Sequence, residues 1–133
     1  MHISTELVAP NITSLKDVTV VQGDLPYLPY QGPGRAVLFC EVFGNPDPEI
    51  TWFFYKDGTG KRKRVNKGGS HLNGNLDDCK NRHSGYFFLR GNDPKHLVIC
   101  NPDFEKHQGK YHCHASNIAG KMEKYASVNI ESK

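Results

Sequence analysis

The feature that most constrains the fold is a series of short apolar segments with a two-residue period, separated by turn residues. In segment 36–43, Ala36, Leu38, Cys40 and Val42 share one parity, as in a strand with one buried face. Gly, Pro and Asn residues separate the segments, and no long amphipathic helical pattern is present. We therefore predict an all-β sandwich with strands near residues 17–22, 35–43, 49–55, 85–90, 95–100, 109–117 and 121–131.

The length of 133 residues fits one domain. We expect an N-terminal extension or first strand over residues 1–16 and a single domain over residues 17–131, with a long loop region at 56–84. Residues 1–10 lack the apolar centre of a secretory signal, and no run of about 18 apolar residues occurs. We expect a fragment of a larger secreted or membrane-anchored protein, with no membrane insertion by this segment.

The four cysteines, at positions 40, 79, 100 and 113, are widely spaced. No two stand close enough for the Cys-x-x-Cys pairs of a zinc ribbon or a thioredoxin-like redox site. Four cysteines permit three disulfide pairings. Disulfides in an oxidising compartment are favoured over four buried thiols in a cytosolic protein.

Cys40, Trp52, Tyr111 and Cys113 follow one another in an arrangement that resembles an immunoglobulin domain. The segments 44–52 and 109–120 resemble the B–C turn and the F strand with its F–G turn in intermediate-set domains, and a variable-like strand plan is the alternative. The span 97–103, read together with 109–113, is most similar to the N-terminal immunoglobulin domain of contactin-type neural cell-adhesion proteins. The resemblance covers about residues 35–130 and implies an immunoglobulin-like two-sheet Greek-key sandwich.

The resemblance also implies roles for these residues. A disulfide between Cys40 and Cys113 would join the two sheets, with the Trp52 indole packed against it and Leu97 in the core. The Tyr111 hydroxyl would bind the backbone at the corner between strands E and F. His107 stands where the family usually has an Asp that pairs with an Arg, so this chain must close the corner differently.

A second disulfide is expected between Cys79 and Cys100. Leu97 and Ile99 should face the core, which turns Cys100 outward on strand E. Strand D is the usual neighbour of strand E, and Cys79 lies just before strand D. Such a bond would hold the long 56–84 region against the edge of the sheet.

The positive charge of the chain is concentrated in one segment. The formal net charge of +3 is too small to argue for nucleic-acid binding. The segment 56–67 contains a single acid, Asp57. Its basic residues are Lys56, Lys61, Arg62, Lys63, Arg64 and Lys67. A solvated hairpin tip is the ordinary explanation of such a run. The functional alternative is an anionic partner, with heparan sulfate weighed above an acidic protein face or phospholipid.

Two histidines lie beside Cys113, and one glycosylation sequon is present. His112 and His114 flank Cys113 and should share the opposite face of the strand, with His107 nearby. No carboxylate or Cys stands at an informative spacing, so we favour a solvated sheet face and expect no metal site. No catalytic motif is found, so we expect neither an enzyme nor a cofactor. Asn11 begins the sequon Asn-Ile-Thr and is the glycosylation candidate.

These features predict a non-enzymatic recognition module of an extracellular or cell-surface protein. It would contact a protein ligand or receptor, with possible help from a glycan, in cell adhesion or receptor signalling. One alternative is a single domain of a secreted matrix or growth-factor protein. Another is a structural domain of an intracellular muscle filament, which would keep Cys40 and Cys113 reduced.

Overall fold

The computed structural model describes residues 6–21, 35–56, 60–65, 85–88, 94–100 and 102–131. Its elements are the strands β1 (Val8–Ser14), β2 (Val18–Val21), β3 (Arg35–Phe39), β4 (Glu41–Asn45), β5 (Glu49–Lys56), β6 (Arg62–Arg64), β7 (Gly85–Phe88), β8 (His96–Cys100), β9 (Gly109–Asn117) and β10 (Gly120–Glu131), and the short helix α1 (Phe104–His107). Within these ranges, no helix has the length and apolar character needed to cross a membrane.

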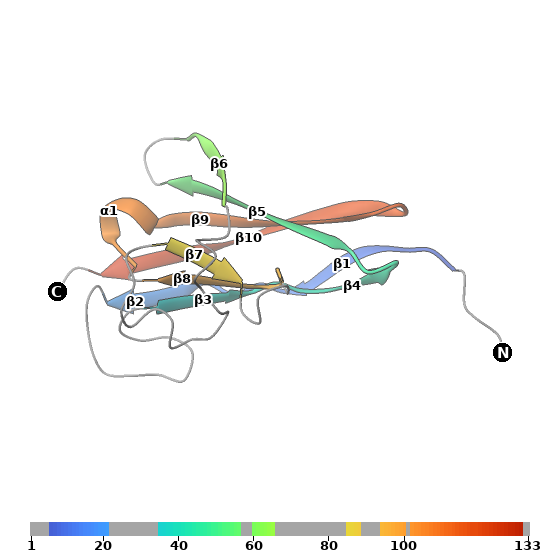
Figure 1. Ribbon diagram of the computed structural model, residues 1–133, viewed down its shortest axis with the longest axis horizontal. Coiled ribbons are helices and arrows are strands. Elements are labelled where there is room, and N and C mark those ends of the chain that lie inside the picture. Colours follow the sequence, from blue (N-terminus) through green and yellow to red (C-terminus); the bar gives the residue numbers. More distant parts are fainter. Residues whose placement is uncertain are drawn as a thin grey trace.

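The strands form two layers. One layer is a five-stranded sheet in the order β2-β10-β9-β5-β6. The other layer contains the sheet β3-β8-β7 and the pair β1-β4, which continue into each other because only Cys40 separates β3 from β4. In Figure 1, β5, β6 and β9 lie above β3 and β8. The predicted all-β immunoglobulin-like sandwich is confirmed.

The N-terminal part of the chain belongs to both layers. Ser14 of β1 pairs with Glu41 of β4, whereas Val18 of β2 pairs in parallel with Val128 of β10. The chain therefore crosses from one sheet to the other within a few residues. This crossing closes the side of the sandwich, since β2 covers the edge of β10 that β9 leaves open.

One predicted strand is divided in the structure, and β1 lies within residues 1–16, where an extension or a first strand was expected. Residues 35–43 were expected as one strand, but β3 pairs with β8 and β4 pairs with β1, so the segment changes partner at Cys40. Within residues 1–16, β1 includes Pro10 at a position that a central strand would not tolerate. Among the described strands, β1 pairs with β4 alone, so it is an edge strand that can hold a proline. Its pairing with β4 is also irregular on both sides of Asn11 and Ile12.

The core lies between the layers and is built from alternating positions. Ala36, Leu38, Cys40 and Val42 are all buried, as their shared parity predicted. On the facing sheet, Trp52, Tyr111 and Cys113 are each at most 1% exposed. Leu97 and Ile99 of β8 also belong to this cluster.

The second face of β8 differs from the prediction. Cys100 was expected to turn outward, and it does lie on the side of β8 opposite Leu97 and Ile99. That side is not open to solvent, because Cys100 is 1% exposed and Val98 is fully buried. Cys100 is disulfide-bonded. Its expected partner, Cys79, lies outside the described residues, so their pairing stays a prediction.

Candidate functional site

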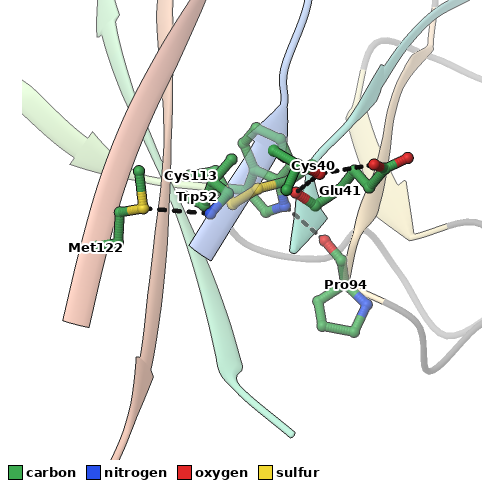
Figure 2. Close-up of a disulfide and its surroundings, with 8 residues drawn as sticks. Cys40, Glu41, Trp52, Pro94, Cys113 and Met122 are labelled. Atoms are coloured by element: carbon green, nitrogen blue, oxygen red, sulfur yellow. Dashed lines mark hydrogen bonds between the residues drawn. A yellow bond between two sulfur atoms is a disulfide. The ribbon is translucent and has the colours of Figure 1, made fainter. Parts of the chain in front are cut away.

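A disulfide joins the two layers at the centre of the molecule. Cys40, between β3 and β4, bonds to Cys113 of β9, and their Cα atoms are 6.5 Å apart. Figure 2 shows the Trp52 indole beside this bond. The indole Nε1 donates a hydrogen bond of 2.6 Å to the carbonyl oxygen of Pro94, which satisfies the one polar group of an otherwise apolar side chain. The disulfide predicted between Cys40 and Cys113 is therefore confirmed.

The corner before β9 is closed by a tyrosine and a histidine. The Tyr111 hydroxyl donates a buried hydrogen bond of 2.9 Å to the carbonyl oxygen of His107. The His107 ring, 4% exposed, accepts a hydrogen bond of 2.8 Å at Nδ1 from the backbone N–H of Asp103. Asp103 in turn caps α1 by accepting from the N–H of Glu105. His107 thus replaces the family's acidic residue through a hydrogen bond to the backbone.

Burial controls the charge of His107. Desolvation lowers the pKa of this imidazole below its ordinary value, and the positive charge of Lys106 acts in the same direction. The carboxylate of Asp103 opposes this shift without reversing it. His107 is therefore a neutral structural group in the folded protein, and it lies apart from the histidines on the outer surface of the sheet.

The outer surface of the five-stranded sheet carries a cluster that we call the aromatic face: Phe53, Tyr55, His112, His114 and Tyr125. Pairing across the strands fixes its composition, because directly opposed residues share a face. Phe53 and Tyr125 both oppose His112. The alternate positions of β5, β9 and β10, including Trp52, Tyr111 and Ala126, belong to the core, so these five side chains lie on the opposite, outer face.

The rings of the aromatic face make two sets of contacts, one around His112 and one around His114. His112 lies between Tyr55 and Tyr125, with ring centroids 4.5 and 5.1 Å away. The His114 ring meets Phe53 edge to face at 4.6 Å. Such contacts hold side chains in defined orientations, which reduces the entropy that binding would otherwise cost.

Cations surround the aromatic face. The Arg62 guanidinium lies 3.9 Å from the centroid of Phe53, and the Lys110 ammonium lies 4.9 Å from that of Tyr125. The strand register adds Arg64 and Lys121 to the same surface. The outward positions of β9 from Lys110 to Ser116, together with the residues opposed to them on β5, β6 and β10, include these four cations. The same positions include two acids, Glu49 and Glu123, so the formal charge of this surface is +2.

Glu123 joins the two outer histidines. Its Oε2 lies 3.0 Å from Nδ1 of His112 and also contacts Nε2 of His114. Partial burial raises the pKa of the Glu123 carboxyl, but the hydrogen bonds and charges of His112 and His114 outweigh burial. The pKa of Glu123 therefore lies below its ordinary value, and the group is a carboxylate at neutral pH.

Glu123 was not predicted from the sequence as a neighbour of the histidines. The prediction that His112 and His114 share the face opposite Cys113 is borne out by the register, but no carboxylate was expected near them. Glu123 reaches them across the hairpin of β9 and β10, where it opposes His114 directly. The signal was present at Gly120, because a tight turn that pairs Asn117 with Gly120 also pairs 114 with 123.

The basic segment borders the aromatic face through Arg62, whereas the sequon lies on β1 in the other layer. Lys61, Arg62, Lys63 and Arg64 are all exposed on or next to the edge strand β6, while Lys56 ends β5. Lys67 and Asp57 lie outside the described residues. Asn11 is exposed on β1, and Thr13 of its sequon donates a hydrogen bond of 2.6 Å to Glu41. An edge strand covered with cations also resists pairing with other chains, so β6 has a structural use.

The comparison with protein families identifies the chain. Residues 30–130 match the immunoglobulin I-set domain family, so the chain belongs to that family. It is 36% identical over 95 residues to "Hemicentin-1" of Mus musculus. The match covers 71% of this chain but 1% of the relative, so this chain corresponds to a small part of a much longer protein.

Solved structures show the same fold at low sequence identity. The N-terminal eight domains of "Down Syndrome Cell Adhesion Molecule" match with a TM-score of 0.63 at 17% identity, covering 96% of this chain and 15% of that one. "Titin M4" matches with a TM-score of 0.59 at 18% identity, covering 95% of this chain and 99% of that one. The same sandwich fold therefore occurs in a cell adhesion molecule and in titin.

Proposed function

We propose that this domain is a non-enzymatic recognition module of an extracellular or cell-surface protein, and that it binds a protein partner in cell adhesion or receptor signalling. The observation that carries this proposal is the aromatic face, with its fixed rings and the cations that surround it. Aromatic residues and Arg are enriched at protein–protein interfaces and dominate their binding energy.

The charge of the surface defines the kind of partner. The four cations Arg62, Arg64, Lys110 and Lys121 against two acids favour a protein surface with an excess of Asp and Glu. Since exposed charges are screened over about 8 Å at physiological ionic strength, binding should weaken as salt is added.

The family and the disulfide support an oxidising location. The Cys40–Cys113 bond is of the kind that persists outside the cytosol. A cell adhesion molecule has a similar fold, which agrees with a role at cell surfaces. The contactin-like branch remains our proposal within the I-set family, and the exposed Asn11 is the proposed glycosylation site. A muscle-filament role is the alternative that the titin likeness keeps open.

The proposal is tested with the wild-type domain displayed on a multivalent carrier and added to intact cells of the tissue that expresses it. We expect binding above that of the reduced and alkylated domain, loss of binding after trypsin treatment of the cells, and retention after heparinase treatment. Binding no stronger than that of the unfolded control would contradict the proposal. Retention after trypsin would contradict a protein partner.

Heparan sulfate is a second proposed partner, supported by the exposure of Lys61, Arg62, Lys63 and Arg64 beside one another. Changing these four residues to Ser should lower the salt concentration needed to elute the domain from heparin. The matched control changes four other lysines, which removes equal charge: Lys16, Lys95, Lys106 and Lys124. Equal elution of the two variants would mean that net charge alone binds heparin and that β6 is no specific site.

A further inference from the structure

We propose that His112, His114 and Glu123 form a binding site for one divalent transition-metal ion, with Zn²⁺ as the expected ion. Each residue offers one ligand atom, and these three atoms lie within 4.8 Å of one another. Two imidazole nitrogens and one carboxylate oxygen are a ligand set that Zn²⁺ accepts when a fourth position is left open. The inference concerns the free domain and does not depend on the proposed partner.

The distances require small movements to bind the ion. In a tetrahedral site with bonds of about 2.1 Å, neighbouring ligand atoms lie roughly 3.4 Å apart. Oε2 of Glu123 already lies 3.0 Å from Nδ1 of His112 and touches Nε2 of His114. Side-chain rotations on the scale of 1 Å would therefore open the cluster enough for an ion to replace the hydrogen-bonded protons.

The neighbouring rings hold the ligands in place. His112 is fixed between Tyr55 and Tyr125, and His114 is fixed by its edge-to-face contact with Phe53. Both histidines are on β9, which is paired on both sides, so their backbone positions are rigid. Ligands held in this way bind a metal at a lower entropic cost than ligands on a loop.

An open depression lies beside the cluster. It has a volume of about 500 Å³ and is lined by residues that include Thr51, Phe53 and Met122, together with His114 and Glu123. The fourth coordination position would open toward this depression, where water or a donor group of a second protein could complete the ion's coordination. Soft thiolate ligands are absent from the set, which favours Zn²⁺ over Cu(I).

The test is calorimetric titration of the untagged full chain with Zn²⁺, repeated with variants His114→Gln and Glu123→Gln. We expect one site per chain in the wild type and at least a tenfold weaker affinity in each variant. The matched controls are His96→Gln, on the other sheet, and Glu131→Gln, farther along β10, which should bind like the wild type. Circular dichroism of each variant verifies that the sandwich is intact.

The titration has outcomes that overturn the proposal. If the wild type binds Zn²⁺ no more tightly than His114→Gln and Glu123→Gln, the cluster is not a metal site. If His96→Gln weakens binding as much, the ion is held elsewhere and the assignment is wrong. Titration with Co²⁺ supplies a second readout, since a tetrahedral site gives visible absorption that both site variants should lose.

Discussion

A single buried residue, His107, closes the corner that an acidic residue usually closes in this family. Its backbone carbonyl accepts a hydrogen bond from the Tyr111 hydroxyl, and its ring accepts one from the Asp103 N–H. The sequence predicted that this corner must differ, because His107 occupies the acidic position. It could not predict the solution, since the hydrogen bond to Asp103 depends on the turn that α1 makes.

Tyr111→Phe should lower the free energy of unfolding by about 1–3 kcal/mol, because it leaves the buried carbonyl of His107 without its hydroxyl donor. Urea denaturation measures the change. Tyr125→Phe is the matched control, and its exposed hydroxyl should matter by less than about 0.5 kcal/mol. Equal effects of the two changes would mean that the corner hydrogen bond adds nothing.

His107 should make the domain acid-sensitive. Because burial lowers the pKa of the folded-state imidazole, the unfolded chain takes up the proton first as the pH falls. Stability should therefore decrease from about pH 6.5, the ordinary imidazole pKa, down through the folded-state pKa. His107→Gln keeps a neutral acceptor but cannot titrate. Its unfolding free energy should fall less between pH 7.5 and pH 5 than that of the wild type, and an equal fall would contradict this assignment.

At the scale of elements, the hairpin of β9 and β10 determines what the outer face contains. Strand positions were predicted well where apolar residues alternate, as in β8, β9 and β10. The prediction was weaker at β1, where Pro10 hides the strand, and at Cys40, where one segment serves two partners. The strand at β1 and the change of partner at Cys40 both depend on which strands pair in the folded sheet. The link between His114 and Glu123 is of the same kind, since it needs the register and not only the sequence spacing.

Gly109, at the start of β9, should tolerate no side chain. A Cβ at this position would lie 2.2 Å from the backbone oxygen of Tyr55. Gly109→Ala should therefore force β5 and β9 apart and lower the unfolding free energy by about 1–3 kcal/mol or more. Gly60→Ala is the control, because it also has a positive φ but no atom within 4 Å of the new Cβ. Its cost should be about 1 kcal/mol, measured by the same urea denaturation.

For the whole molecule, the disulfide and the layers it joins provide a rigid base for the aromatic face. Cys40 and Cys113 are separated by 73 positions, so the chain-entropy account gives the bond about 4 kcal/mol of stabilisation. Replacing both by Ala should remove a comparable amount. Thermal unfolding monitored by Trp52 fluorescence measures it, and an unchanged midpoint would show that the layers need no covalent link.

The central claim is that the domain binds its partner through the outer surface of the five-stranded sheet. The most direct measurement is the apparent affinity of the multivalent domain for cells, comparing Tyr125→Ala with Phe43→Ala. Both residues are exposed aromatics, at 52% and 61%, but Phe43 lies on β4 in the other layer. We predict at least a tenfold loss for Tyr125→Ala, about 1.4 kcal/mol, with Phe43→Ala close to the wild type and both variants unfolding at the wild-type temperature. A loss with Phe43→Ala that matches or exceeds the loss with Tyr125→Ala would place the binding surface elsewhere and contradict the account.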